Sequence, residues 1–362
     1  MGWSLTIGRI AGTDIRLHFT FLLFLVWIGV ADYMAGGPAA ALDSISFILL
    51  VFLCVTLHEF GHIAMARRFG IRTPQVILSP IGGIASLERM PQKPAQELLV
   101  AIAGPLVNVA IALLLMAAFG LAIDTATAAH FESSTLAERL LIVNVTLVLF
   151  NLIPAFPMDG GRVLRALLAM NMGSQRATAL AARIGQGFAF LFVLLGLFYN
   201  PILMLIGIFI YFAATAEEQQ SSFTGFASQL RVRDAMEPSP ILLESTQPLT
   251  RAIEALLSSP QKEYPVLDAG SRIVGLLDRD AMILGLRDRG SAVSVGEVMR
   301  ASEPLRAEQT LIDAFTAMRG RGVKAEVVID AEGRPVGILT HDNIAEMMMV
   351  ESVQPGWRFR RR

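Results

Sequence analysis

Long apolar runs alternate with short polar stretches through the first 217 residues of the chain. Six of these runs, at residues 17–36, 44–69, 96–122, 136–153, 179–199 and 201–217, approach or exceed the roughly 20 residues that a helix needs to cross a bilayer. Only "YNP" separates the last two, and its proline is placed to open the final helix. The pattern predicts a polytopic α-helical membrane domain with six spans over residues 1–217.

Residues 70–95 interrupt this helical pattern. Two short β-prone runs, at residues 75–78 and 84–87, flank the sequence "SPIGG". We expect a β-hairpin-like insertion that dips partly into the membrane. A plain cytoplasmic loop is the alternative.

The basic residues of the short loops predict the orientation of the domain, because cytoplasmic loops carry an excess of Lys and Arg. Arg9 and Arg16 precede the first span, and only Arg139 lies on the opposite side. The loops after spans two and four hold, at or near their ends, Arg67, Arg68, Arg72, Arg89, Lys93, Arg162, Arg165, Arg176 and Arg183. We therefore expect a multi-pass protein of the cell membrane with both termini in the cytoplasm. Arg outnumbers Lys by 27 to 3, which is typical of a GC-rich bacterial genome.

The remainder of the chain has the composition of a soluble domain. Residues 218–362 carry 18 Lys/Arg and 20 Asp/Glu, against 12 and 11 in residues 1–217. A polar linker at 218–230 is followed by an internal repeat with a period of about 62 residues, in which 231–243 resembles 294–306 and 263–283 resembles 325–345. Each unit reads as lead-in, helix, strand, turn, strand, helix. This predicts a soluble α/β domain built from modules 231–290 and 291–350, followed by a basic tail at 351–362.

Charge and cysteine content exclude several classes of function. The net charge of −1 predicts no affinity for nucleic acid. The single cysteine, Cys54, excludes an internal disulfide and a cysteine-based zinc cluster.

The second apolar run contains "HEFGH", which places His58, Glu59 and His62 where water is scarce. Ionisable side chains at the bilayer centre cost about 2.5–3.5 kcal/mol each on insertion scales, so three together need a reason. On a helix the two histidines share one face, and in H-E-x-x-H they bind zinc while the glutamate acts as general base. A polar helix–helix contact is the structural alternative.

A catalytic zinc site takes three protein ligands, so a third must come from elsewhere in the chain. The best candidate is Asp159 in "NLIPAFPMDGGR", where Pro154 and Pro157 end the fourth span and two glycines follow. Irregular backbone at membrane depth is tolerated where it lines a cavity. The structural alternative is that Asp159 only caps the next helix.

These motifs resemble those of the site-2 protease family of intramembrane zinc metalloproteases: HEFGH in the second span, "AGPLVN" in the third and "NLIPAFPMDGG" after the fourth. The resemblance implies a Zn²⁺ ion held by His58, His62 and Asp159, with Glu59 as base, and cleavage of a transmembrane helix of another protein. It also implies four positions that hold the substrate, namely Asn151, Asn108, Gly82 and Gly83. For Gly104 and Asn108, small-residue helix packing with one interhelical amide bond is the alternative.

The tail resembles a tandem pair of cystathionine-β-synthase (CBS) modules, many of which bind adenine nucleotides. Of the family's Gly-x-x-Thr/Ser-x-x-Asp signature, the second repeat retains Gly337 and Thr340 but has Asn343 in place of the aspartate. In the first repeat Asp278 takes the hydroxyl position, where it would repel phosphate. A possible nucleotide site at Thr340 and Asn343, or a structural or homodimerising module, is therefore expected.

Two other functions are compatible with parts of this pattern. CBS modules also regulate membrane transporters and channels, but the fifth and sixth runs contain almost none of the polar residues that an ion pathway needs. A catalytically dead scaffold would tolerate damage to the motif, yet HEFGH and the aspartate are intact. An intramembrane protease, with the CBS tail as its candidate regulator, is the function that the sequence favours.

Overall fold

The computed structural model describes residues 4–80, 82–86, 91, 93–122, 131 and 134–353. The chain divides into two compact units, Met1–Gln219 and Gln220–Arg362. Most of the predicted basic tail lies outside the described residues, as does most of the segment 123–134 between the third and fourth apolar runs.

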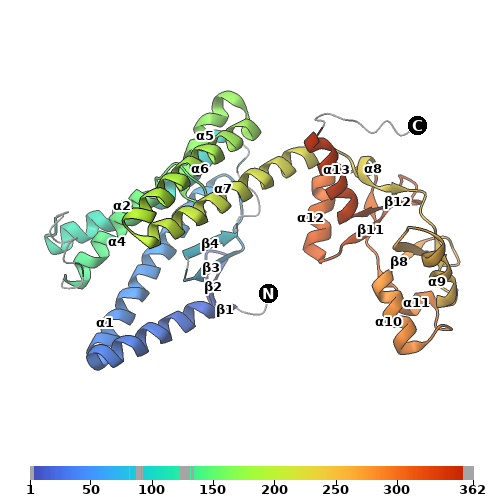
Figure 1. Cartoon of the computed structure of the whole chain (residues 1–362), viewed down its shortest axis with the longest axis horizontal. Helices are drawn as coiled ribbons and strands as arrows, with labels where there is room; N and C mark the ends of the chain where they lie inside the picture. The colour runs from blue at the N-terminus through green and yellow to red at the C-terminus, as the bar shows by residue number, and fades with distance from the viewer. Residues whose placement is uncertain are drawn as a thin grey trace. The chain divides into compact units, whose positions relative to one another are not determined.

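The first unit is mainly helical (Figure 1). Its helices are α1 (Phe19–Arg68), α2 (Pro94–Phe119), α4 (Leu136–Asn151), α5 (Asp159–Met172), α6 (Ser174–Phe198) and α7 (Pro201–Ala227). Pro201 opens α7, as its position in the sequence predicts. Helix α4 begins with a capping box, in which Thr135 and Glu138 each accept a backbone N–H from the other.

Helix α1 contains two of the predicted spans. A straight helix of 50 residues would be about 75 Å long, more than twice the ~30 Å bilayer core. Gly37 has φ 75° and ψ −168°, outside the helical region, and Pro38 follows it. Glycine reaches positive φ without a Cβ clash and proline removes an N–H donor, so the chain bends and the two arms of α1 diverge (Figure 1).

Four of the described helices, α1, α2, α6 and α7, are long and apolar enough to cross a membrane. Helix α4 corresponds to the fourth predicted span, but its 16 residues fall short of the roughly 20 that a bilayer requires. The six-span count therefore stays a prediction.

The first unit also contains a four-stranded sheet. Its strands lie in the order β1 (Ser4–Ile10), β2 (Thr13–His18), β3 (Gln75–Ser79) and β4 (Gly82–Ser86). Strands β3 and β4 are antiparallel, which confirms the predicted hairpin. Strands β1 and β2 were not expected, although Ile15 and Leu17 alternate with polar residues in β2. Strand β2 pairs in parallel with β3, so residues far apart in sequence complete the sheet and leave β4 at its edge.

The predicted linker at 218–230 is largely helical, because α7 continues to Ala227. In the second unit, Phe223 and Ala227 pack on a core formed around Leu311, Met318 and Leu339. Burial of these two apolar side chains explains why the polar sequence around them does not form a flexible linker.

The second unit consists of two interleaved sheets. The first repeat supplies α8 (Val232–Ala235), β5 (Glu237–Pro238), β6 (Leu243–Glu244), α9 (Leu249–Ser258), β7 (Glu263–Leu267), β8 (Ile273–Asp278) and α10 (Arg279–Arg289). The second repeat supplies α11 (Val295–Val298), β9 (Arg300–Ala301), β10 (Leu305–Arg306), α12 (Leu311–Arg321), β11 (Ala325–Ile329), β12 (Pro335–Thr340) and α13 (His341–Val353).

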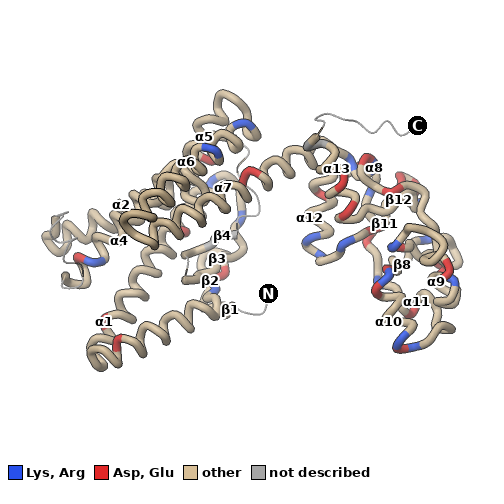
Figure 2. Tube along the Cα trace, viewed as in Figure 1, with Lys and Arg blue, Asp and Glu red and all other residues tan. Residues whose placement is uncertain are grey.

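The sheet orders are β6-β7-β8-β9 and β10-β11-β12-β5, so each repeat lends its lead-in strand to the other repeat's sheet. Each of the modules predicted at 231–290 and 291–350 therefore contributes one strand to the sheet of the other module. Charged residues are dense along this unit and sparse over the helices of the first unit (Figure 2).

Candidate metal centre

Two histidines of α1 face the interior of the first unit. His58 and His62 lie four residues apart, and each retains less than a tenth of its exposed surface. Because 3.6 residues make one helical turn, both imidazoles project from the same face. An otherwise apolar helix therefore presents two nitrogen ligands side by side.

The third candidate ligand comes from the loop after α4. Residues 152–158 are irregular, as the prolines predict, and the Phe156–Pro157 peptide bond is cis. Helix α5 then begins at Asp159, whose side chain is buried. Its Oδ2 atom lies 3.1 Å from His58 Nε2 and 3.3 Å from His62 Nε2.

The three side chains form a compact set of donors. The two Nε2 atoms are 3.1 Å apart, and one ligand atom from each residue lies within 4.8 Å of the others. Two imidazoles and one carboxylate are the ligands of a well-known class of catalytic zinc site, which leaves a fourth position open. The residues present therefore fit Zn²⁺.

Both histidines have a hydrogen-bond partner on the side away from this cluster. The Nδ1–H of His62 donates to the backbone carbonyl of Val100 over 2.7 Å. The Nδ1–H of His58 donates to the side-chain oxygen of Asn108. Partners of this kind fix the ring orientation and keep the proton off the nitrogen that faces a metal.

Glu59 lies beside strand β4. A Cβ atom added to Gly83 would come within 2.8 Å of Glu59 Cγ and 3.3 Å of its Oε1. Among the described residues, the carboxylate has no hydrogen-bond or ion-pair partner. The predicted base is thus placed between α1 and the edge strand, with its oxygen atoms available to a reactant.

Gly104, for which the sequence left helix packing as an alternative, lies against both histidines. A Cβ atom there would lie 2.7 Å from His58 Nε2 and closer still to His62 Nε2. Gly104 and Asn108 are four residues apart, so α2 brings a bare backbone to both histidines and an amide to His58. This spacing was the signal that could have assigned both positions to the metal centre.

A buried ion pair lies on α2 and α5 and was also missed. Arg165 was counted as a loop charge, but the structure buries it with Glu97 and joins its Nε to Glu97 Oε1 over 2.6 Å. Glu217 of α7 lies 3.8 Å from the guanidinium. Glu97 precedes Val100 by one helical turn and Arg165 follows Asp159, so the pair fastens together the two helices that carry parts of the centre.

The other residues predicted to hold substrate occupy different places. Asn151 is the last residue of α4, and within the described part of the chain no hydrogen bond links it to the metal cluster. Gly82 and Gly83 begin the edge strand β4. Asn108 is fully buried against His58, which favours an action on that histidine over contact with substrate.

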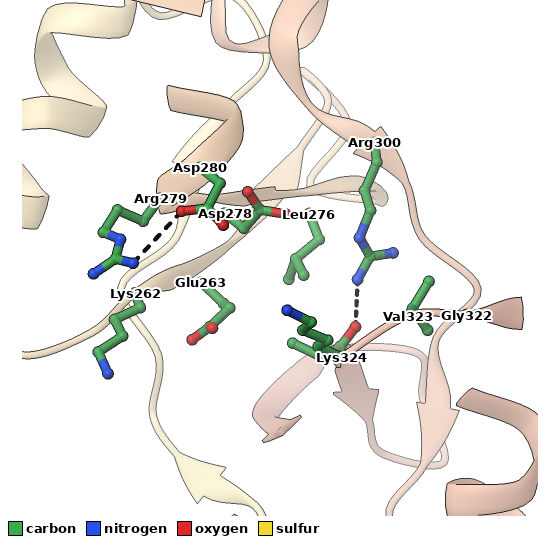
Figure 3. A pocket seen from close by; sticks show the side chains of 11 residues that line it. Lys262, Glu263, Leu276, Asp278, Arg279, Asp280, Arg300, Gly322, Val323 and Lys324 are labelled. Carbon is green, nitrogen blue, oxygen red and sulfur yellow. Dashed lines mark hydrogen bonds and ion pairs between the residues drawn. The ribbon is translucent and has the colours of Figure 1, made fainter. Parts of the chain in front are cut away.

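The second unit contains a cavity of about 340 Å³ (Figure 3). Its charged lining residues are Lys262, Arg279, Arg300, Lys324, Glu263, Asp278 and Asp280. Arg300 donates to the carbonyl of Ala325 across this cavity, and burial raises the pKa of Glu263. The mixed charge provides cations for an anionic ligand, and the carboxylates limit how much negative charge such a ligand can carry.

The predicted nucleotide residues do not line this cavity. Thr340 Oγ1 donates to Asn343 Oδ1 over 2.8 Å, and it accepts the backbone N–H of Asn343 over 3.0 Å. The two side chains therefore cap the start of α13. In the first repeat Asp278 caps α10 in the same way, through Ala281 N–H, and it also lines the cavity.

Two protein-family models match the chain. Peptidase family M50 matches residues 46–126 and 120–194, and the CBS domain matches residues 295–350. The two ranges of the M50 match together contain all three candidate ligands, and the CBS match covers the second repeat of the tail.

Similar proteins occur in archaea and bacteria. A zinc metalloprotease of Methanocaldococcus jannaschii is 35% identical over 278 residues, which are 76% of this chain and 78% of that protein. Rip3 of Mycobacterium tuberculosis is 30% identical over 371 residues, 96% of this chain and 93% of that protein. The solved structure of a site-2 protease from M. jannaschii matches with 37% identity and a TM-score of 0.45, covering 60% of this chain and 95% of that one.

Proposed function

This chain belongs to peptidase family M50, the site-2 proteases, as a zinc metalloprotease with a CBS region, and we propose that it cleaves a transmembrane helix of a membrane-anchored substrate. The observation that carries the proposal is the convergence of His58, His62 and Asp159 beside Glu59 within an apolar helical unit. Family membership supports intramembrane proteolysis in general. It therefore favours this function over the alternative, a CBS-gated transporter or channel.

In this proposal the two histidines and Asp159 hold the metal. When bound, Zn²⁺ supplies Lewis-acid polarisation of a carbonyl and acidifies a water molecule. The Glu59 carboxylate takes a proton from the attacking water and returns it to the amide nitrogen that leaves. Its lack of a fixed partner among the described residues suits this shuttle, because neither oxygen is engaged before substrate arrives.

Strand β4 offers a means to hold the substrate. A helix buries its peptide bonds in internal hydrogen bonds, so the scissile segment must become extended before water can attack it. An edge strand pairs with an added strand through backbone groups. Strand β4 is such an edge and lies against Glu59 at Gly83, so a substrate strand paired there would pass close to the base. We assign Gly82 and Gly83 to this role, with Asn151 at the end of α4 as a further substrate contact.

The proposal extends to topology and regulation. The loop charges support a multi-pass protein of a bacterial cell membrane with both termini in the cytoplasm. The cavity of the CBS unit supports binding of an anionic effector, such as an adenine nucleotide, that alters the rate of cleavage. Homodimerisation through the CBS modules is a second route to the same regulation.

The test compares two substitutions in the full chain, purified and reconstituted in liposomes with a membrane-anchored peptide substrate. Glu59→Gln should abolish cleavage and retain zinc, because the glutamate is not a ligand. Asp159→Ala should lose zinc and cleavage together. Glu138→Gln is the matched control, since this carboxylate forms the capping box at the start of α4 and is not among the candidate ligands.

Two results would count against the assignment. Cleavage at the native rate in Glu59→Gln would remove Glu59 from the mechanism. Native zinc content in Asp159→Ala would show that the third ligand is another residue.

A further inference from the structure

Two buried asparagines connect His58 to helix α4. Asn108 of α2 and Asn144 of α4 are both completely inaccessible to solvent. Asn108 Nδ2 donates to Asn144 Oδ1 over 2.8 Å, and the other end of the Asn108 amide faces His58 Nδ1. A buried polar group without a partner costs roughly 1–3 kcal/mol, so two amides in contact within an apolar unit call for an explanation.

The hydrogen bonds of Asn144 fix the direction of this chain. Its Nδ2 group lies 2.8 Å from the backbone carbonyl of Leu140 and 3.5 Å from Cys54 Sγ. A carbonyl oxygen only accepts hydrogen bonds, so the NH₂ end of Asn144 must face Leu140. The oxygen end of Asn144 then faces Asn108 and can only accept.

The same reasoning passes from Asn108 to the histidine. Since Asn144 presents an acceptor, Asn108 must turn its NH₂ group toward Asn144 and its oxygen toward His58. An acceptor at His58 Nδ1 requires the proton on that nitrogen. With Nδ1 protonated, the ring can bind a metal only through the lone pair of Nε2, the atom that faces His62 and Asp159.

We infer that Asn144 is a positioning residue of the metal centre, which acts through Asn108 to hold His58 in the zinc-binding tautomer. The Leu140 carbonyl sets the polarity of the relay, and two amides carry it across two helix interfaces. His62 needs no relay because its Nδ1–H meets the Val100 carbonyl directly. The inference rests on the proposed role of His58 as a zinc ligand.

Removing Asn144 frees the Asn108 amide to rotate. In Asn144→Leu, which keeps the branching and the number of side-chain heavy atoms, Asn108 Nδ2 loses its acceptor and can turn toward His58. An N–H facing Nδ1 favours the opposite tautomer, with the proton on Nε2. Loss of an outer partner of a zinc ligand typically weakens metal binding about 10–100-fold, and we expect a loss of this size.

A second substitution separates this relay from a structural role. In Asn108→Asp the residue facing His58 has only acceptor oxygens, so rotation no longer changes what the histidine meets. We expect Asn108→Asp/Asn144→Leu to bind zinc more tightly than Asn144→Leu alone. A purely structural role for Asn144 predicts no such rescue. Thr146→Val is the matched control, because this hydroxyl lies on the exposed side of the same helix and, among the described residues, bonds only to Ile142 O.

The experiment measures the zinc dissociation constant by chelator competition on the full chain in detergent, for the native protein, these variants and His58→Ala. Native affinity in folded Asn144→Leu, or an equal loss in the double variant, overturns the relay. Native affinity in His58→Ala overturns the ligand assignment itself, which is a separate failure of the proposed function.

A spectroscopic readout needs no substitution at the relay. Nitrogen-15 NMR of histidine in the zinc-free native chain reports the tautomer of each ring, and His58→Ala identifies the His58 signals. We expect a proton on His58 Nδ1 in the native chain and its loss from Nδ1 in Asn144→Leu, with His62 unchanged as the internal reference. An unprotonated Nδ1 of His58 in the native chain would contradict the inference, even if Asn144→Leu did not fold.

Discussion

Replacing Gly104 by alanine should weaken zinc binding without unfolding the protein. The new Cβ atom would lie 2.7 Å from His58 Nε2 and closer to His62 Nε2, whereas ordinary van der Waals contact begins at 3.4 Å. Both of these ring nitrogens are the atoms that we assign as zinc ligands. The histidines must therefore shift, or α2 must move away from α1.

The size of the effect follows from the cost of overpacking. One extra methyl group in a well-packed interior costs about 1–3 kcal/mol. If this strain falls on the zinc-bound state, the dissociation constant rises about 5- to 140-fold, since each 1.4 kcal/mol is about a factor of ten. The helix itself gains, because alanine favours a helix interior over glycine by roughly 0.5–1 kcal/mol.

The assay is zinc affinity by chelator competition, with the thermal unfolding midpoint of the zinc-free chain measured in the same detergent. Gly187→Ala in α6 is the control, because a Cβ there meets no atom within 4 Å. It provides the helix-propensity gain alone and should leave zinc affinity unchanged. Zinc binding by Gly104→Ala at native strength would refute the placement of the donor atoms against α2.

Two further predictions concern the ion pair and the tail. Arg165→Met leaves Glu97 buried without its partner and should destabilise the membrane unit by about 3–5 kcal/mol, seen as a lower unfolding midpoint in detergent; Arg165→Met/Glu97→Leu should recover much of this loss, and no recovery would contradict the pairing. Deleting residues 228–362, which keeps α7 whole, should change the cleavage rate of a membrane-anchored substrate at constant zinc content. An unchanged rate with and without adenine nucleotides would make the tail an assembly module instead.

The features that the sequence predicted well depend on local geometry. The helical stretches, the hairpin at β3 and β4 and the tandem repeat follow from the periodicity of apolar residues and from the positions of glycine and proline. His58 and His62 share a face because they are four residues apart in one helix. Short-range spacing was enough to place these two ligands together and to recognise the kind of chemistry.

Other features went beyond what a linear pattern contains. The linker at 218–230 looked polar, yet the partly buried Phe223 and the buried Ala227 order most of it as part of α7. Exchange of lead-in strands between the repeats also depends on how two similar units pack together.

The sequence by itself determined the composition of the centre: two histidines, a glutamate and an aspartate in motifs that name a zinc protease. Only the tertiary structure decided how they meet, since Asp159 lies 101 residues from His58, and Asn108 and Asn144 are 36 residues apart. Helical periodicity states which side chains share a face, but it does not state which faces pack together. That choice depends on the fit of all the helices at once, and it gives His58 its relay, Gly104 its closeness to the ligands and Arg165 its buried partner.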